Sequence, residues 1–148
     1  MEQQEQEAML RASFYEQQAQ QVREQIDILE QEIQELEKSN NHLYIINSTK
    51  ENSMLASLGK GIYLPSSLAD KTLFVEVGSG VIVKKSIQET QSIIENQIKK
   101  LKEVRLQLLA RLEFFVKSLK QLIEKVNHTH DHSHNHQDHD HSGHDHKH

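Results

Sequence analysis

The sequence predicts an α+β fold, a long antiparallel two-helix coiled coil joined by two β-hairpins that assemble into an oligomeric β-barrel. Apolar residues recur at heptad spacing in two segments, and these segments carry opposite net charge. Between them, a strand–turn–strand unit with a G-x-G turn occurs twice. We therefore expect an N-terminal helix at 1–44, hairpins at 45–85, a C-terminal helix at 86–127 and a disordered histidine-rich tail at 128–148.

The first helix is predicted from a seam of apolar residues. From Ala8 to Leu36 these residues step by alternating fours and threes, and Asn40 and Leu43 continue the same register. Glutamine and glutamate, which favour helix, occupy most of the positions between them. The pattern predicts a helix from about Glu5 to Leu43.

The second helix repeats this spacing from Ile87 to Val126. Two seam positions, Gln91 and Arg105, are polar, and polar seam residues commonly fix register and partner choice at some cost in stability. Ser86 followed by Glu89 is typical of a capping box. We therefore expect the helix to begin beside Ser86.

The charges of the two helical segments favour pairing with each other. Residues 1–40 hold ten acidic and three basic side chains, whereas residues 84–126 hold ten basic and five acidic ones. A basic helix can bind nucleic acid, but the acidic helix in the same chain is its natural partner. The sequence therefore predicts two complementary antiparallel helices and no nucleic-acid partner, with both termini at the same end of the coiled coil.

The segment between the helices contains a repeat of 19 residues, with Gly59-Lys60-Gly61 matching Gly78-Ser79-Gly80. No G-x-x-x-x-G-K-[ST] motif is present and no helix follows these glycines directly, which excludes a phosphate-binding loop. Two isolated hairpins expose strand edges, and their pairing between subunits would protect those edges. The residues expected to mediate oligomerisation are Leu58, Gly59, Gly61, Ile62, Leu64, Val75, Val77, Gly78, Gly80, Val81 and Val83.

The composition indicates a non-enzymatic protein of the cytoplasm. The 148 residues include no cysteine and no apolar run of the length that a membrane span needs. The N-terminus is acidic and polar, unlike a signal peptide. We therefore expect no membrane partner. His42 is the one histidine outside the tail, and no set of residues typical of a catalytic site can be placed in a cleft.

The tail combines histidines at nearly every second position with four aspartates. Imidazole and carboxylate suit nickel, zinc or copper, so we expect metal affinity that is incidental or, in a second hypothesis, biological. No cofactor is expected to be required. The candidate metal ligands are His128, His130, His132, His134, His136, His139, His141, His144, His146 and His148.

The order helix, two G-x-G hairpins, helix resembles the alpha-class subunit of prefoldin, an archaeal and eukaryotic co-chaperone. The best match is VEVGSGVIVKKSIQETQSIIENQIKKL at 75–101, and SLGKGIYLP at 57–65 occupies the place of the family's other turn. The resemblance covers residues 5–126, and two hairpins are typical of the alpha class. One departure is Pro65, which removes a hydrogen-bond donor from the end of a predicted strand.

The resemblance implies a subunit of a molecular chaperone. Two alpha and four beta prefoldin subunits would form a hexamer whose coiled-coil tips capture unfolded polypeptides and pass them to a group II chaperonin, without nucleotide. The candidate tip residues are apolar groups near both termini: Met9, Leu10, Phe14, Phe114, Val116, Leu119, Leu122, Ile123 and Val126. The alternative hypotheses are a coiled-coil scaffold and a metal-storage protein that binds metal through its tail.

Overall fold

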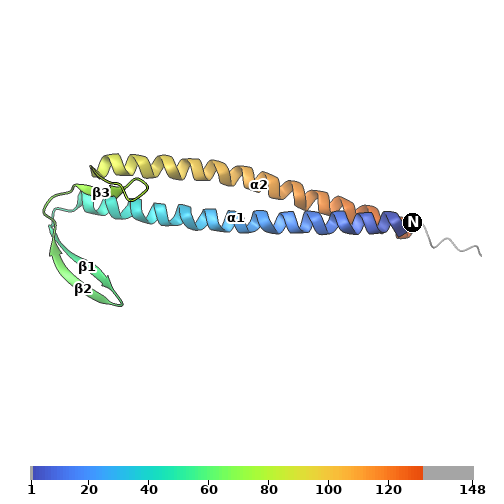
Figure 1. Cartoon of the computed structure of the whole chain (residues 1–148), viewed down its shortest axis with the longest axis horizontal. Coiled ribbons are helices and arrows are strands. Elements are labelled where there is room, and N and C mark those ends of the chain that lie inside the picture. Colours follow the sequence, from blue (N-terminus) through green and yellow to red (C-terminus); the bar gives the residue numbers. More distant parts are fainter. Residues whose placement is uncertain (1, 132–148) are drawn as a thin grey trace, which may run out of the picture. The chain divides into compact units, whose positions relative to one another are not determined.

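The computed structural model describes residues 2–131, which form two long helices and two antiparallel hairpins (Figure 1). The elements in chain order are α1 (Glu2–Ser48), β1 (Ser53–Gly59), β2 (Ile62–Ser67), β3 (Leu73–Glu76), β4 (Ile82–Lys85) and α2 (Ile87–Asp131). This confirms the predicted α+β class, while assembly into a barrel stays a prediction. None of the helices within 2–131 has the length and hydropathy needed to cross a bilayer.

The described residues fall into two compact units, and each long helix contributes to both. The helix-end unit contains residues 2–21 and 111–131, and the hairpin unit contains residues 22–110. We describe each unit by itself.

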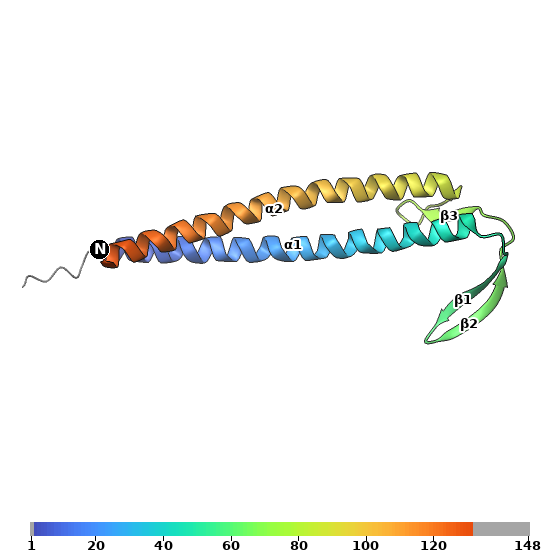
Figure 2. The same cartoon turned by 180° about the vertical axis from the view of Figure 1, so that it is seen from behind.

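In the hairpin unit, α1 and α2 run side by side in opposite directions (Figures 1 and 2). The buried apolar residues here are Val22, Ile26, Ile33, Ile87 and Ile98, all of which lie on the predicted seams. The remaining seam residues of this unit are buried or half-buried as well, whereas the intervening glutamines and glutamates are exposed. The heptad prediction is therefore confirmed in this unit.

Near the hairpins, polar side chains of α1 and α2 contact each other. The carboxylate of Glu95 accepts hydrogen bonds from Asn40 Nδ2 at 3.5 Å and from the Tyr44 hydroxyl at 3.3 Å. Gln91, on the seam one turn earlier, is 8% exposed, and its Nε2 has no hydrogen-bond partner in the structure. Lys102 forms an ion pair with Glu37 at 3.2 Å. These contacts pair higher numbers on α1 with lower numbers on α2, as antiparallel packing requires.

Side chains complete the ends of both helices where they meet the hairpins. The backbone N–H of Glu89 donates to Ser86 Oγ at 3.1 Å, so Ser86 caps α2 as the sequence predicted. At the other helix, the Lys71 ammonium donates to the carbonyls of Asn47 at 2.9 Å and Thr49 at 3.2 Å. A cation at a helix C-terminus satisfies carbonyls that lack intrahelical partners.

The two hairpins use the same turn. Gly59, Lys60 and Gly61 have φ values of 93°, 51° and 78°, and Gly78, Ser79 and Gly80 have values of 121°, 50° and 73°. In the second turn Val81 N donates to the Gly78 carbonyl at 2.9 Å, and both central residues have positive φ, as hairpin turns of this kind require. The 19-residue repeat is therefore a repeat of backbone conformation.

The helix-end unit is held together by aromatic packing. Tyr15 of α1 and the buried Phe115 of α2 have ring centroids 6.2 Å apart, and the guanidinium of Arg111 lies 5.7 Å from the centroid of Phe115. Ala19 is buried in the same unit. Both seams of this unit are buried or half-buried, so the heptad prediction is confirmed here too.

Both helices extend beyond the predicted bounds. α1 ends at Ser48, where we expected Leu43, and α2 continues to Asp131, into the segment predicted to be disordered. The Thr129 hydroxyl supports this last turn by donating to the carbonyls of Lys125 at 3.2 Å and Val126 at 2.7 Å. The rest of the predicted disordered tail lies outside the described residues.

Candidate functional site

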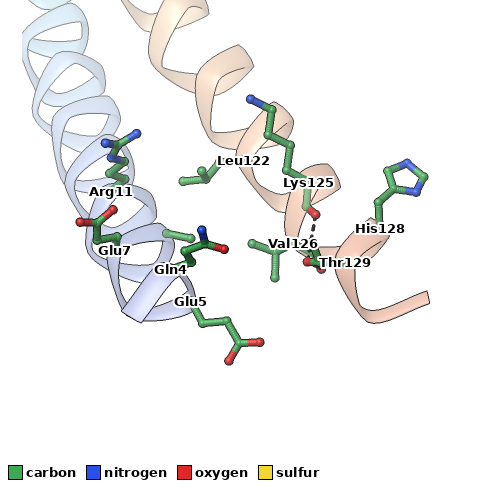
Figure 3. A pocket seen from close by; sticks show the side chains of 10 residues that line it. Gln4, Glu5, Glu7, Arg11, Leu122, Lys125, Val126, His128 and Thr129 are labelled. Carbon is green, nitrogen blue, oxygen red and sulfur yellow. Dashed lines mark hydrogen bonds between the residues drawn. The ribbon is translucent and has the colours of Figure 1, made fainter. Parts of the chain in front are cut away.

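A groove opens between the two helices of the helix-end unit, close to the beginning of α1 and the end of α2 (Figure 3). Its volume is about 650 Å³. Leu122 and Val126 point from α2 toward α1, and Gln4 reaches from α1 toward α2. We refer to this hollow and the smaller one described below together as the helix-end groove. The larger hollow is lined by Gln4, Glu5, Glu7, Ala8, Arg11, Leu122, Lys125, Val126, His128 and Thr129.

The groove exists because the seam residues of α1 have small side chains near the N-terminus. The seam positions of α1 in the hairpin unit are mostly valine, isoleucine and leucine, whereas Ala8 and Ala12 occupy the seam here. An alanine methyl group is too small to cover two aliphatic side chains on the facing helix. Leu122 and Val126 therefore stay only half-buried and supply the apolar floor of the groove.

A second, smaller hollow of about 170 Å³ shares that floor. It is lined by Ala8, Met9, Ala12, Leu122, Ile123, Val126 and Asn127. Met9 and Ile123 are exposed, at 73% and 49%. Apolar side chains of another polypeptide could therefore contact both hollows across one apolar floor.

The structure brings only some of the predicted tip residues together. Met9, Leu122, Ile123 and Val126 line one hollow or both. Leu10, Phe14, Phe114 and Val116 are exposed but line neither, and Leu119 is half-buried on the seam. The rings of Phe14 and Phe114 instead pack on their chain neighbours Tyr15 and Phe115, at centroid distances of 5.9 Å and 5.5 Å.

Sequence reasoning missed Ala8, Ala12 and the polar rim of the groove. The signal for the alanines was present, because two consecutive seam positions carry the smallest apolar side chain. The rim residues could not be identified from the sequence, because which residues form the rim depends on how the two helices face each other. The rim holds charges of both signs: Glu5, Glu7 and Arg11 on α1, and Lys125 on α2.

The hairpins form a separate apolar surface. Most of the predicted oligomerisation residues with large side chains are at least half exposed: Leu58, Ile62, Leu64, Val77 and Val81. Val75 and Val83 are half-buried, and they pair with each other across the second hairpin. Gly59, Gly61, Gly78 and Gly80 form the two turns.

Both faces of the first hairpin are apolar. Tyr63 and Leu64 are neighbours on one strand and thus point to opposite faces, yet they are 59% and 52% exposed. Each strand of the described residues has one hydrogen-bonded neighbour, so each also has an unpaired edge. Exposed apolar faces with unpaired edges are typical of a surface that another subunit covers.

The predicted metal ligands fall almost entirely outside the described part of the chain. His128 lies on the rim of the helix-end groove and His130 lies in the last turn of α2, whereas His132 and all later histidines lie outside the described residues. Within residues 2–131, no group of three or more histidine, aspartate or glutamate side chains is arranged to hold a metal ion.

Taken together, these features define a class of protein: a two-helix coiled coil whose helices are joined by two β-hairpins with exposed apolar faces. The chain matches the family model described as "Prefoldin subunit" over residues 15–131. This chain belongs to the prefoldin family, a family of non-enzymatic chaperone subunits, so the predicted resemblance is confirmed at the level of the family, and the alpha class stays a prediction.

Among solved structures, the chain is similar to filamentous PFD from Methanocaldococcus jannaschii, determined by cryo-EM. The TM-score is 0.66 and the sequence identity is 23%, and the match covers 77% of this chain and 96% of that one. At this identity the similarity supports the fold alone. A comparison with curated proteins found no match.

Proposed function

We propose that this chain is an alpha-class prefoldin subunit of the cytoplasm that captures unfolded polypeptides at its helix-end groove, without nucleotide. Through its hairpins it assembles with beta-class subunits into a hexamer of two alpha and four beta chains, which delivers the captured polypeptide to a group II chaperonin. Membership of the prefoldin family and the presence of two hairpins support this assignment.

The observation that carries the proposal is the uncovered apolar floor of the groove. Across the helix pair, Leu122 and Val126 face the small side chains of Ala8 and Ala12, while Met9 and Ile123 are exposed beside them. An unfolded chain offers many different apolar side chains, and an open groove with an unbranched, flexible methionine can contact most of them. Each site binds weakly, and several sites in one assembly bind together with much higher avidity.

The hairpins support the assembly half of the proposal. Burial of their exposed apolar side chains contributes roughly 25 cal/mol for each Å² removed from water. Partner strands also satisfy the edge N–H and C=O groups that each hairpin leaves unpaired.

A second candidate is a polymer of this chain alone, and the filamentous PFD structure is the observation that favours it. The same apolar hairpin faces could pair with copies of themselves. The mass of the assembly separates the two candidates, because a hexamer with a smaller partner has one fixed mass and a filament has many.

The test of the groove is a capture assay with matched variants of the complete assembly. The double variant Met9→Ser/Ile123→Ser alters the hollow, and the control Ile28→Ser/Leu106→Ser alters two residues that are 67% and 66% exposed on the same helices but line neither hollow. Aggregation of a chemically unfolded protein on dilution is measured by light scattering.

We expect the groove variant to need about tenfold more assembly for the same protection, because each removed aliphatic contact contributes about 1 kcal/mol at several sites. The control variant should protect like the native chain. Equal protection by both variants would exclude the groove as the capture site.

A further inference from the structure

The hydrogen bonds of the first hairpin show which of its backbone groups face outward. The Leu68 N–H donates to the Asn52 carbonyl at 2.7 Å, so these residues form a hydrogen-bonded pair at the open end of the hairpin. Hydrogen-bonded and non-hydrogen-bonded pairs alternate along an antiparallel ladder, so Leu55 and its partner Pro65 form a non-hydrogen-bonded pair. The backbone groups of residues in such pairs point away from the neighbouring strand.

This alternation gives the two outer edges of the hairpin different chemistry. On β1, Ser53, Leu55 and Ser57 each present an N–H donor and a C=O acceptor to the outside. On β2, the central outward residue is Pro65, which has no N–H, and its ring fills the place that a partner's carbonyl would approach. The β1 edge can therefore accept a further strand, whereas Pro65 blocks the β2 edge.

The outward groups of β1 match those of a second copy of the same strand. They are spaced by two residues and are symmetric about Leu55, so two copies related by a twofold axis at Leu55 can pair antiparallel. Ser53 of each copy would lie opposite Ser57 of the other, and about six hydrogen bonds would form. In the intervening pairs, the long side chain of Met54 would lie beside the methyl group of Ala56 of the other copy.

The side chains of β1 also suit pairing with a copy of itself. The strand contains no charged residue, so self-pairing places no like charges opposite each other within it. Met54, Leu55 and Leu58 are exposed in the single chain, and a neighbouring strand would remove part of their apolar surface from water.

We propose that this chain self-associates through the outer edge of β1, which forms a four-stranded sheet in the order β2–β1–β1–β2. Pro65 then lies on both outer edges of the sheet, so growth through this hairpin stops at two copies. The inference rests on the proposed function, since it assigns the contact between the two copies of this chain in the hexamer.

A single introduced cysteine tests the position of the contact, because the native chain has no cysteine. The Cα atoms of a hydrogen-bonded pair are about 5.5 Å apart, within reach of a disulfide, so the purified full-length variant Leu55→Cys should form a covalent dimer under mild oxidation. Tyr63→Cys is the matched control and should stay free of cross-links, since Tyr63 is similarly exposed on the same face but lies on the blocked edge. Equal cross-linking of both variants, or of neither, would overturn the proposal.

Substitutions at the two outward positions test the two edges separately. Leu55→Pro removes the N–H at the twofold axis but no hydrogen bond within the hairpin. We expect the dimer dissociation constant, measured by analytical ultracentrifugation, to rise by at least about tenfold, because each copy loses one hydrogen bond and brings a ring into the contact. An unchanged constant would exclude the β1 edge.

Pro65→Val is expected to have the opposite effect, because it restores an N–H donor to the outer edge of β2. The same measurement should detect assemblies larger than a dimer. If this variant stayed dimeric, the claim that Pro65 limits growth would be wrong.

Addition of beta-class subunits from the source organism separates this inference from the proposed function. A chain that is monomeric alone but forms the hexamer with these subunits would overturn the β1 contact and leave the proposed function intact. A dimer that cross-links through Leu55→Cys but never forms a hexamer would instead contradict the proposed function.

Discussion

The hairpin unit and the helix-end unit both expose apolar side chains, but they do so in different ways. The hairpins present branched and aromatic residues on short strands whose edges are unpaired, so partners must supply both apolar contact and ordered hydrogen bonds. The helix-end groove lies on helices whose backbone hydrogen bonds are internal, and its apolar lining consists of alanine, methionine, leucine, isoleucine and valine.

This difference explains why the two surfaces suit different partners. A strand edge pairs well only with another strand in one register, which favours a permanent and specific subunit interface. A groove without backbone donors or acceptors places no such condition on its occupant, which favours transient contact with many sequences. The two units are therefore suited to the two roles that we propose, specific assembly through the hairpins and non-specific binding through the groove.

The largest expected effect comes from placing charge on the hairpin surface. In the variant Ile62→Asp/Leu64→Asp, assembly with partner subunits should be lost, because each unpaired carboxylate buried at an interface costs several kcal/mol. Native mass spectrometry measures the assembly and circular dichroism measures the helices. Lys60→Asn is the matched control, since asparagine tolerates the φ of 51° at the turn. Normal assembly of the charged variant would show that this face stays exposed.

Truncation of residues 1–14 should affect the other unit alone. It removes Ala8, Met9 and Ala12 from the groove, and we expect capture of an unfolded protein to weaken by about tenfold as apolar contact at several sites is lost. The mass of the assembly should not change. If the truncated chain failed to assemble, the helix-end unit would be part of the subunit interface and our division of roles would be wrong.

A smaller effect is expected at the polar position of the α2 seam. Gln91→Leu removes a buried Nε2 that lacks a hydrogen-bond partner, so the free energy of unfolding should rise by about 1 kcal/mol. Thermal unfolding followed by circular dichroism measures this change, and Gln91→Glu is the control that should lower stability. A fall in stability with leucine would mean that Gln91 forms a hydrogen bond in the assembly.

The smallest effect is expected from the ion pair between Glu37 and Lys102. Both side chains are nearly half exposed, at 47% and 46%, so Lys102→Met should change the free energy of unfolding by less than about 0.5 kcal/mol. The same thermal measurement, repeated in high salt, checks it. Neither this variant nor Gln91→Leu should alter capture, and an effect of either on capture would contradict the separation of the two units.

The elements could be predicted from the sequence because each has a strong local signal. The seams from Ala8 to Leu43 and from Ile87 to Val126 have heptad spacing, Ser86 has a capping partner, and the two G-x-G units differ from both helices in composition. The helix ends were less predictable, because tertiary contacts decide how far a helix propagates. The bonds from Lys71 to the end of α1 are one such contact.

The groove was only partly predictable. Met9 and Ile123 could be identified as apolar residues off the seam, but so could Leu10 and Phe14, which do not line it. Spacing along one helix indicates which side chains are exposed, whereas convergence depends on the register between two helices. Contacts between the helices, such as the hydrogen bond from Tyr44 to Glu95, belong to that register. The heptad pattern does not determine which residues of the two helices form such contacts.

The most direct test of the account is the composition of the natural complex. Native lysate of the source organism is passed over nickel resin, which the chain's own histidines should bind, and the gently eluted complex is weighed by native mass spectrometry. The account predicts a hexamer that contains two copies of this chain and four of a smaller coiled-coil subunit. A homo-oligomer loaded with metal and lacking such a partner would contradict it.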